Sequence, residues 1–487
     1  GETSCEAVVS SFLERIDARN DDLNALLTVD RDGSLNHARY LDSQRQRGNA
    51  RPLAGLVLAV KDNISIRRQQ LTCGSKMLES FESLYDATVV QKLRDAGAIF
   101  IGKANCDEFA MGSSNETSHF GPVQHPDAEA YVPGGSSGGS AAAVKAGFCH
   151  AALGSDTGGS IRQPASFCGV VGLKPTYGRV SRFGLVAFAS SLDVIGPLTH
   201  SVEDAAILLN TLAGADPNDA TSARVPVPDY TEALTDAVDG LTIGLPKEYF
   251  GDGLDADIGR MVQAQVEALA ERGATVKDVS LPHTKYGVAA YYLVATAEAS
   301  SNLARYDGVR FGHRADLSDS DDALAAAPHT NGTPDDGTPG KGADLQALYT
   351  RTRTEGFGDE VKRRIMLGTY ALSAGYYDKY YDKAQRVRTL IRNDFDRAFE
   401  SVDVLVTPTT PTPPFQRGEK VDDPLAMYLS DVYTVTANLA GVPGLSVPIG
   451  PHPSDPHLPV GMQLLGAPFD EGALLQTGHA IERINEE

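Results

Sequence analysis

Two segments rich in glycine and serine carry side chains whose types and spacing suit acyl-transfer chemistry. Within residues 152–181, the turn DTGGS (156–160) lies between apolar stretches. Consecutive backbone N–H groups next to two glycines can form an anion-binding nest. A serine hydroxyl at the end of such a nest stands beside donors that can stabilise an oxyanion, as a nucleophile of acyl transfer requires. Ser160 is therefore a candidate nucleophile.

A hydroxyl nucleophile needs a base, and a lysine can serve if burial keeps its amine neutral. Lys61 directly follows the apolar run LAGLVLAV (53–60) in a chain that is poor in lysine. The 11 histidines do not gather near these serines in the sequence, although residues distant in sequence can meet in the fold. The alternative for Lys61 is an ordinary exposed side chain at a strand end.

The second segment, VPGGSSGGSAAAVKAG, spans residues 132–147. It offers the hydroxyls of Ser136, Ser137 and Ser140, and the residues alone do not choose among them. Its letters also match G-x-S-x-G, the nucleophile elbow of α/β-hydrolase esterases. An elbow follows a buried strand, whereas this segment follows a short stretch that ends in Pro133. A flexible linker is the remaining interpretation, but linkers do not interrupt an apolar α/β pattern.

The stretch GAIFIGKA (97–104) nearly matches a phosphate-binding P-loop, G-x4-G-K-[ST]. Ala104 stands where the hydroxyl that holds magnesium should be, and the residues between the two glycines are apolar. Because a P-loop needs a flexible loop there, the stretch is interpreted as a buried strand. A nucleotide-binding or scaffold protein is accordingly disfavoured.

The elements that must position these residues alternate along the chain, which predicts an α/β protein with a large, mostly buried sheet. Apolar runs of strand type lie at 53–64, 96–105, 239–246 and 402–411, and helical spacing is found in 1–50, 201–214 and 256–273. Residues 315–344 are rich in Asp, Gly, Pro and Thr, which predicts an acidic, flexible insertion. We expect residues 1–487 to form a single domain that contains this insertion.

Charge and cysteine content exclude several classes of protein. The chain has 64 acidic and 43 basic residues and a net charge of -21, which argues against direct contact with nucleic acid. Such a surface is typical of salt-adapted proteins, with an ordinary acidic cytosolic protein as the alternative. The five cysteines form no CxxC pair, so neither a zinc site nor a disulfide framework is predicted. With no signal-peptide layout and no run of about 18 apolar residues, we expect a cytoplasmic protein that does not enter a membrane.

Three segments together resemble the amidase signature family: AVKDNI around Lys61, PGGSSGGSAAAV (133–144) and GSDTGGSIRQPASFCG (154–169). The similarity continues over essentially the whole chain, in residues 172–199, 291–312, 355–381 and 437–450. The resemblance implies an α/β protein with the amidase-signature fold, in which helices cover both faces of a large mixed β-sheet.

The resemblance further implies a Ser–cis-Ser–Lys triad. In this triad Ser160 would be the acyl-forming nucleophile, Ser136 the bridging serine in a cis peptide, and Lys61 the base. The oxyanion would be held by backbone N–H groups, for which the candidates are Thr157, Gly158, Gly159 and Ser160. The resemblance implies no metal site and no cofactor in this chain.

The longer segments are similar to family members that hydrolyse glutamine for tRNA-dependent amidotransferases. That similarity implies that Arg364, in EVKRRIMLG, binds the substrate carboxylate. It places the partner of the ammonium at Asp431, in MYLSDVYT, and a pocket wall at Tyr291. Ammonia would pass to a B subunit, which uses ATP and magnesium to amidate a misacylated tRNA, and a small C subunit would join the two. The similarity leaves open whether Glu-tRNA(Gln), Asp-tRNA(Asn) or both are served.

One segment departs slightly from the family pattern, and one alternative function remains. Residues 111–117 are altered at Ser113 and Asn115, so no role is assigned to them. The alternative is a free-standing amidase that acts on simple or aryl amides. A neutral amide would offer no charged partner to Arg364 or Asp431, which favours the glutaminase.

Overall fold

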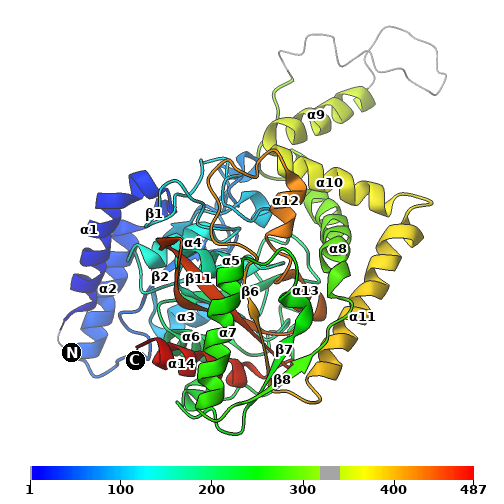
Figure 1. Ribbon diagram of the computed structural model, residues 1–487. Helices are drawn as coiled ribbons and strands as arrows, with labels where there is room; N and C mark the ends of the chain where they lie inside the picture. The colour runs from blue at the N-terminus through cyan, green and yellow to red at the C-terminus, as the bar shows by residue number, and fades with distance from the viewer. Residues whose placement is uncertain (1–2, 318–340, 487) are drawn as a thin grey trace.

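A single sheet of 11 strands forms the centre of the computed structural model, which describes residues 3–317 and 341–486 (Figure 1). The strand order across the sheet is β1-β3-β2-β4-β6-β5-β10-β11-β9-β7-β8. The strands are β1 (Leu26–Val29), β2 (Val57–Lys61), β3 (Ile99–Ala104), β4 (Ala151–Asp156), β5 (Val171–Lys174), β6 (Val194–Thr199), β7 (Thr242–Pro246), β8 (Thr275–Val279), β9 (Val404–Pro408), β10 (Gly444–His452) and β11 (Asp455–Gly466).

The sheet is mixed, as predicted. Strand β2 runs parallel to both β3 and β4, and β7 runs parallel to β8 and β9. The remaining neighbours pair antiparallel, including the hairpin of β10 and β11. Because β2 and β4 are parallel neighbours, their carboxyl ends lie at the same edge of the sheet, where the chain continues into Lys61 and Asp156.

Helices cover both faces of the sheet. Alternate residues of a strand point to opposite faces, and in β2 Leu58 and Val60 join one apolar cluster while Val57 and Ala59 join another. The first cluster includes residues of α3, α6, α7 and α14, and the second includes residues of α1, α2, α4 and α5. These helices are α1 (Cys5–Leu23), α2 (Arg31–Gln46), α3 (Thr88–Ala96), α4 (Gly138–Lys145), α5 (Arg162–Cys168), α6 (Val202–Leu212), α7 (Ala256–Glu271) and α14 (Glu471–Glu486).

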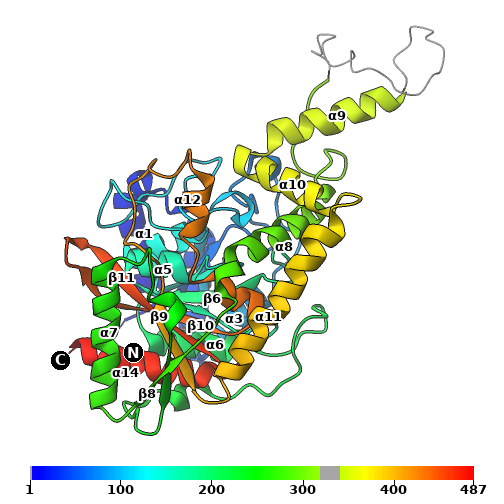
Figure 2. The ribbon, with the colours of Figure 1, turned by 45° about the vertical axis from the view of Figure 1, so that its right-hand side comes forward.

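A third apolar cluster joins a group of helices at one side of the molecule. It contains residues of α8, α10, α11 and α13, and Figure 2 shows α8, α10 and α11 side by side, with α9 extending beyond them. These helices are α8 (Gly287–Asn302), α9 (Lys341–Gly356), α10 (Asp359–Leu372), α11 (Lys383–Ala398) and α13 (Val435–Ala440), and the short helix α12 (Pro424–Leu429) lies before α13.

The apolar runs that predicted strands became β2, β3, β7 and β9, and the predicted helices at 201–214 and 256–273 became α6 and α7. The prediction for residues 1–50 was incomplete. They contain two helices as expected, but β1 lies between them and pairs antiparallel with β3 at the edge of the sheet. Four residues, LLTV, are too short to show a strand period, so only the pairing partner defines β1.

Most of the predicted insertion, residues 318–340, lies outside the described residues. Helix α9 begins at Lys341, within the last residues of the predicted range. Ala315, at its beginning, is buried against the rest of the protein. None of the helices in the described ranges combines the length and the hydropathy that crossing a bilayer requires.

Candidate active site

The base predicted from the sequence lies at the buried carboxyl end of β2. All five residues of β2 are buried, so the strand carries Lys61 into the interior, where its side chain has no exposed surface. Burial lowers the pKa of Lys61 from the usual 10.5 to about 8, because an ammonium group loses its hydration there. Several buried carboxylates raise the pKa but do not cancel this effect. Lys61 therefore suits proton transfer near neutral pH, and the alternative of an exposed lysine is wrong.

The amine of Lys61 contacts three serine hydroxyls. Its Nζ donates to Ser136 Oγ at 2.8 Å, to Ser137 Oγ at 2.9 Å and to Ser155 Oγ at 3.0 Å. Ser137 Oγ in turn donates to the backbone carbonyl of Ser155 at 3.1 Å, and Ser140 Oγ donates to that of Leu153 at 3.0 Å. Both of these serines therefore use their hydroxyl hydrogen on the backbone. Among the described residues, Lys61 is the only hydrogen-bond partner of Ser136 Oγ, so this hydroxyl is free to pass a proton.

The glycine-rich segment around Ser136 is a rigid part of the core. The Gly135–Ser136 peptide is cis, and helix α4 begins two residues later, at Gly138. Gly139 lies against the backbone oxygens of Asn105 and Ala25, so a Cβ there would collide with both. The flexible-linker interpretation is therefore wrong. The nucleophile-elbow interpretation is wrong too, because a loop and not a strand precedes the segment.

The near P-loop sequence is a strand, as interpreted from its apolar residues. It forms β3, whose six residues are all buried, and Lys103 Nζ is paired with Asp62 Oδ1 at 2.9 Å inside the protein. This lysine is thus committed to a buried ion pair and cannot reach a phosphate at the surface.

The turn that carries Ser160 joins β4 to α5. Ser160 is 8% exposed, and its backbone oxygen accepts a hydrogen bond from Ser137 N at 3.1 Å. This bond holds the nucleophile segment beside the segment that carries Ser136. Gly159 N donates to Asp156 Oδ1 at 2.9 Å, so one of the predicted oxyanion donors is already used. In the described part of the chain, no hydrogen bond is formed by the N–H groups of the others, Thr157, Gly158 and Ser160.

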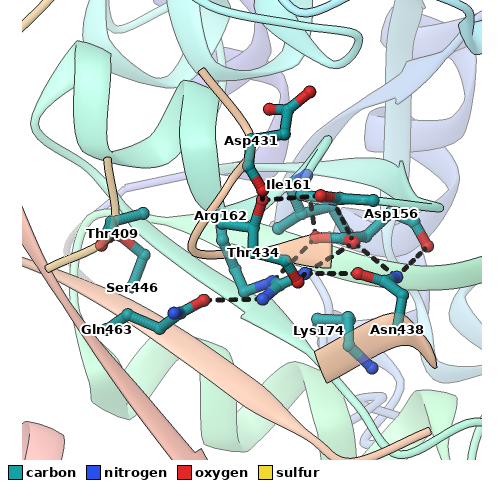
Figure 3. Close-up of polar contacts among 12 residues, drawn as sticks. Asp156, Ile161, Arg162, Lys174, Thr409, Asp431, Thr434, Asn438, Ser446 and Gln463 are labelled. Atoms are coloured by element: carbon teal, nitrogen blue, oxygen red, sulfur yellow. Dashed lines mark hydrogen bonds and ion pairs between the residues drawn. The ribbon is translucent and has the colours of Figure 1, made fainter. Parts of the chain in front are cut away.

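A buried ionic network lies directly behind this turn (Figure 3). Arg162 binds Asp156 through two nitrogens, each at 3.0 Å, and both side chains are fully buried. Its remaining donors reach Gln463 Oε1 at 2.6 Å and Asn438 Oδ1 at 2.7 Å. Burial alone raises the pKa of Asp156, but the charge of Arg162 lowers it to about 2. Asp156 is therefore an ionised anchor for the backbone of the turn.

Arg364 lines a cavity of about 350 Å³ that α10 and α12 border. The guanidinium is buried and donates through Nε to Glu360 Oε1 at 2.7 Å. It also lies over the rings of Tyr292 and Tyr428, 5.3 and 5.4 Å from their centroids. Tyr428 Oη donates to the same Glu360 oxygen at 2.9 Å. These contacts fix the guanidinium plane, which suits two-point binding of a carboxylate.

Asp431 is buried and contacts the wall of the same cavity. Ser113, which lines the cavity, donates its hydroxyl hydrogen to Asp431 Oδ2. Burial raises the pKa of Asp431 to about 7, although Ser113 and the positive charge of Arg364 act in the opposite direction. Asp431 does not line the cavity itself, nor does Ser160. Asp431 reaches the cavity wall through Ser113.

Tyr291 lies against the nucleophile turn. Its ring lies on Gly158 so closely that a Cβ at that position would collide with it. The structure thus brings Tyr291 next to the turn, Lys61 next to Ser136, and Asp431 next to a cavity residue. Sequence reasoning missed Ser113, Ser155, Glu360 and Tyr428. The altered segment 111–117 was a signal for Ser113, whereas nothing in the sequence marked the other three.

Comparison with known proteins places the chain in a family. A family model described as Amidase matches residues 7–475. The chain is 72% identical to the A subunit of glutamyl-tRNA(Gln) amidotransferase from Salinibacter ruber, over 99% of this chain and 97% of the relative. It is 56% identical to the protein of the same name from Koribacter versatilis, over 99% and 95% of the two chains.

A solved structure agrees with these relatives. The crystal structure of the A subunit of glutamyl-tRNA(Gln) amidotransferase from Thermotoga maritima matches with a TM-score of 0.77 and 41% identity. The match covers 98% of this chain and 91% of the other. The family expected from the sequence motifs is thereby confirmed: this chain belongs to the amidase family.

Proposed function

We propose that the chain is the glutamine-hydrolysing subunit of an aminoacyl-tRNA amidotransferase, with Ser160 as nucleophile. The observation that carries the proposal is the contact between a buried, easily deprotonated Lys61 and Ser136, beside the turn of Ser160. The names and high identity of the relatives support the same function.

The proposed reaction begins with a proton relay. Neutral Lys61 accepts the proton of the Ser136 hydroxyl, Ser136 accepts that of Ser160, and Ser160 Oγ attacks the side-chain amide carbon of glutamine. The carbonyl oxygen becomes an oxyanion, which the free N–H groups of the turn stabilise. Losing one such donor typically raises the barrier by about 3–4 kcal/mol.

The tetrahedral intermediate then collapses. The proton returns through Ser136 to the leaving nitrogen, the C–N bond breaks, and ammonia departs while a glutamyl ester on Ser160 remains. Water attacks this ester while its proton passes to the same base. The bond between the acyl carbon and Ser160 Oγ then breaks, and the base returns the proton to Ser160 Oγ. The products are glutamate, ammonia and the restored serine hydroxyl.

Substrate selection rests on the two charged ends of glutamine. In the proposal, Arg364 binds the α-carboxylate, Asp431 binds the α-ammonium, and Tyr291 forms the wall between this pocket and the turn. Glu360 and Tyr428 keep the guanidinium in place. The buried position of both charged groups supports this role, because each lacks the hydration that an exposed group would have.

The ammonia would go to a partner protein and not to free solution. Exposed apolar side chains lie in α10 and in and just before α12, the two helices that border the cavity. Such side chains are unusual on a surface that faces water. We name them the apolar rim: Met366, Leu367, Tyr370, Val421, Leu425 and Leu429. The proposed occupant is the B subunit, which would use ATP and magnesium to amidate the misacylated tRNA, with the C subunit joining the two.

Two further features support this assignment of tasks. The strongly acidic chain is unsuited to binding tRNA itself, so tRNA contact falls to the B subunit. All five cysteines are free and buried, which is consistent with a reducing cytoplasm. We also propose, from the same acidic charge, that the protein is adapted to high salt.

The first test is ammonia release from glutamine in concentrated salt, with the partner subunits present. We expect Ser160→Ala to lower kcat at least about a thousandfold. The matched control, Ser140→Ala, removes a buried hydroxyl that does not touch Lys61 and should keep its activity. Full activity of Ser160→Ala would overturn the mechanism.

A second variant tests the substrate class. Arg364→Ala should raise KM for glutamine roughly 10- to 100-fold, since a charge-assisted contact is lost. Its turnover of a simple neutral amide should not change. If Arg364→Ala hydrolyses glutamine as well as the wild type, the pocket assignment fails and a free-standing amidase becomes the better description.

A further inference from the structure

A closed ring of hydrogen bonds holds the turn that carries the nucleophile (Figure 3). Thr434 Oγ1 donates to the backbone oxygen of Gly158 at 2.6 Å, and Gly159 N donates to Asp156 Oδ1 at 2.9 Å. Arg162 donates to Asp156 Oδ1 at 3.0 Å and to the backbone oxygen of Thr434 at 3.1 Å. The ring therefore closes through both side chains and backbone.

The peptide unit between Gly158 and Gly159 is tied at both of its polar ends by this ring. Such a tie matters here because two adjacent glycines allow a peptide to rotate at low cost. A rotation would point the Gly158 oxygen at the carboxylate of Asp156, which repels it. It would also disturb the neighbouring peptide units, which carry the N–H groups of Gly158 and Ser160.

Close packing leaves the turn little room to adjust. Gly159 has a φ of +138°, and a Cβ there would collide with the hydroxyl of Thr434. Thr434 has no exposed surface, so water cannot replace its hydroxyl on the Gly158 oxygen. A buried carbonyl that loses its donor is unfavourable, and the peptide would be free to seek another partner.

The same threonine is one turn away from the proposed ammonium site. Thr434 N donates to the backbone oxygen of Asp431 at 3.0 Å. The same oxygen lies 3.1 Å from Thr434 Oγ1, whose one hydrogen is used on the nearer Gly158 oxygen. The side chain of Asp431 contacts Ser113 in the cavity wall. A single short segment, 431–434, thus carries the proposed substrate-binding carboxylate at one end. At its other end it carries the hydroxyl that bonds the nucleophile turn.

We propose that Thr434 is a positioning residue that couples the amino-acid pocket to the oxyanion-binding turn. Its hydroxyl holds the Gly158–Gly159 peptide in the orientation that leaves the N–H groups of Gly158 and Ser160 open to the oxyanion. Gly159 N–H is bonded to Asp156, where it helps to fix this peptide, and it does not hold the oxyanion. The inference rests on the proposed function, because it takes Ser160 as the nucleophile.

The test compares steady-state glutamine hydrolysis by Thr434→Val and wild type, with the partner subunits present. Removing the hydroxyl should lower kcat roughly 10- to 100-fold, somewhat less than the loss of a whole oxyanion donor. KM for glutamine and inhibition by glutamate should stay within about threefold, because ground-state contacts are unchanged. Thr434→Ser keeps the hydroxyl and should restore kcat.

Thr436→Val is the matched control. Thr436 is also buried and lies two residues further on, but its hydroxyl bonds Tyr249 Oη at 2.6 Å and does not touch the turn. Its kcat should stay within about threefold of wild type. An equal loss of kcat in both valine variants would assign the effect to packing and overturn the proposal.

The remaining outcomes separate this inference from the function on which it rests. If Ser160→Ala is inactive while Thr434→Val keeps full kcat, only the inference fails. If Ser160→Ala is active, the proposed function fails first. Should Thr434→Val not fold, as judged by its thermal melt, Thr434→Ala also lacks the hydroxyl, and full kcat in that variant overturns the proposal equally.

Discussion

At the scale of single residues, the site depends on where each serine sends its hydroxyl hydrogen. Ser136, Ser137 and Ser140 are close neighbours in the sequence and all are fully buried. Two of them donate to backbone carbonyls, whereas the hydroxyl of Ser136 has Lys61 as its only hydrogen-bond partner among the described residues. A relay needs a hydroxyl whose hydrogen is free to move, so this difference supports the role proposed for Ser136.

The lowered pKa of Lys61 predicts the pH dependence of catalysis. The protonated amine cannot accept a proton, so Lys61 by itself should make kcat/KM rise about tenfold per pH unit below its pKa of about 8 and level off above it. The measurement is glutamine hydrolysis between pH 6 and pH 9 at constant high salt.

Asp431 also makes glutamine hydrolysis increase with pH. Asp431 must be ionised to bind an ammonium, and burial raises its pKa to about 7. A neutral amide substrate does not need Asp431, so its profile should retain only the limb that belongs to Lys61. A rate that is constant from pH 6 to pH 9 for both substrates would contradict Lys61 as the base.

At the scale of elements, one arginine joins four parts of the fold behind the site. Arg162, at the start of α5, contacts Asp156 at the end of β4, Asn438 in α13 and Gln463 in β11. All of these side chains are buried. The nucleophile turn is therefore positioned by helices and strands that lie far apart along the chain.

The buried contacts of Arg162 predict that its removal will strongly destabilise the protein. Arg162→Ala would leave Asp156 charged, buried and without its cation, so the free energy of unfolding should fall by about 3–5 kcal/mol. The measurement is denaturant unfolding of the whole chain. As a matched control, Arg386→Ala removes an exposed ion pair with Asp382 and should cost at most about 1 kcal/mol. Equal free energies of unfolding for the two variants would show that the buried network does not stabilise the fold.

At the scale of the whole molecule, the apolar rim is set on a strongly acidic protein. Met366 and Leu425, from α10 and α12, are 70% and 63% exposed, while the chain as a whole carries a net charge of -21. Burying such side chains against a partner is favourable even in concentrated salt, where charge contacts are screened. The rim therefore suits an interface with a partner protein.

Charged substitutions in the rim should break the complex but spare the site. We expect Met366→Glu combined with Leu425→Glu to weaken association with the partner subunits at least about tenfold, because two carboxylates would be buried in the interface. Gel filtration of the mixed subunits in high salt measures this. Leu84→Glu, on an exposed side chain outside the rim, is the control. Unchanged association of the double variant would place the interface elsewhere.

Much of the fold could be predicted from the sequence because its signals are local. The apolar run before Lys61 and the run that became β3 are each long enough to identify a buried strand. The glycines of the DTGGS turn likewise indicated backbone donors next to a hydroxyl. Strand β1, in contrast, has only four residues and no local signal, so its partner in the sheet defines it.

The sequence by itself determined the family, the α/β class and the residue types that could carry out acyl transfer, since these depend on composition and on short spacings. Only the tertiary structure decided which serine keeps a free hydroxyl, that Gly159 N–H is used by Asp156, and that Ser113 contacts Asp431. The physical reason is that a hydrogen bond is directional and exclusive. Which donor meets which acceptor is settled by segments as distant as 113 and 431 when they pack together.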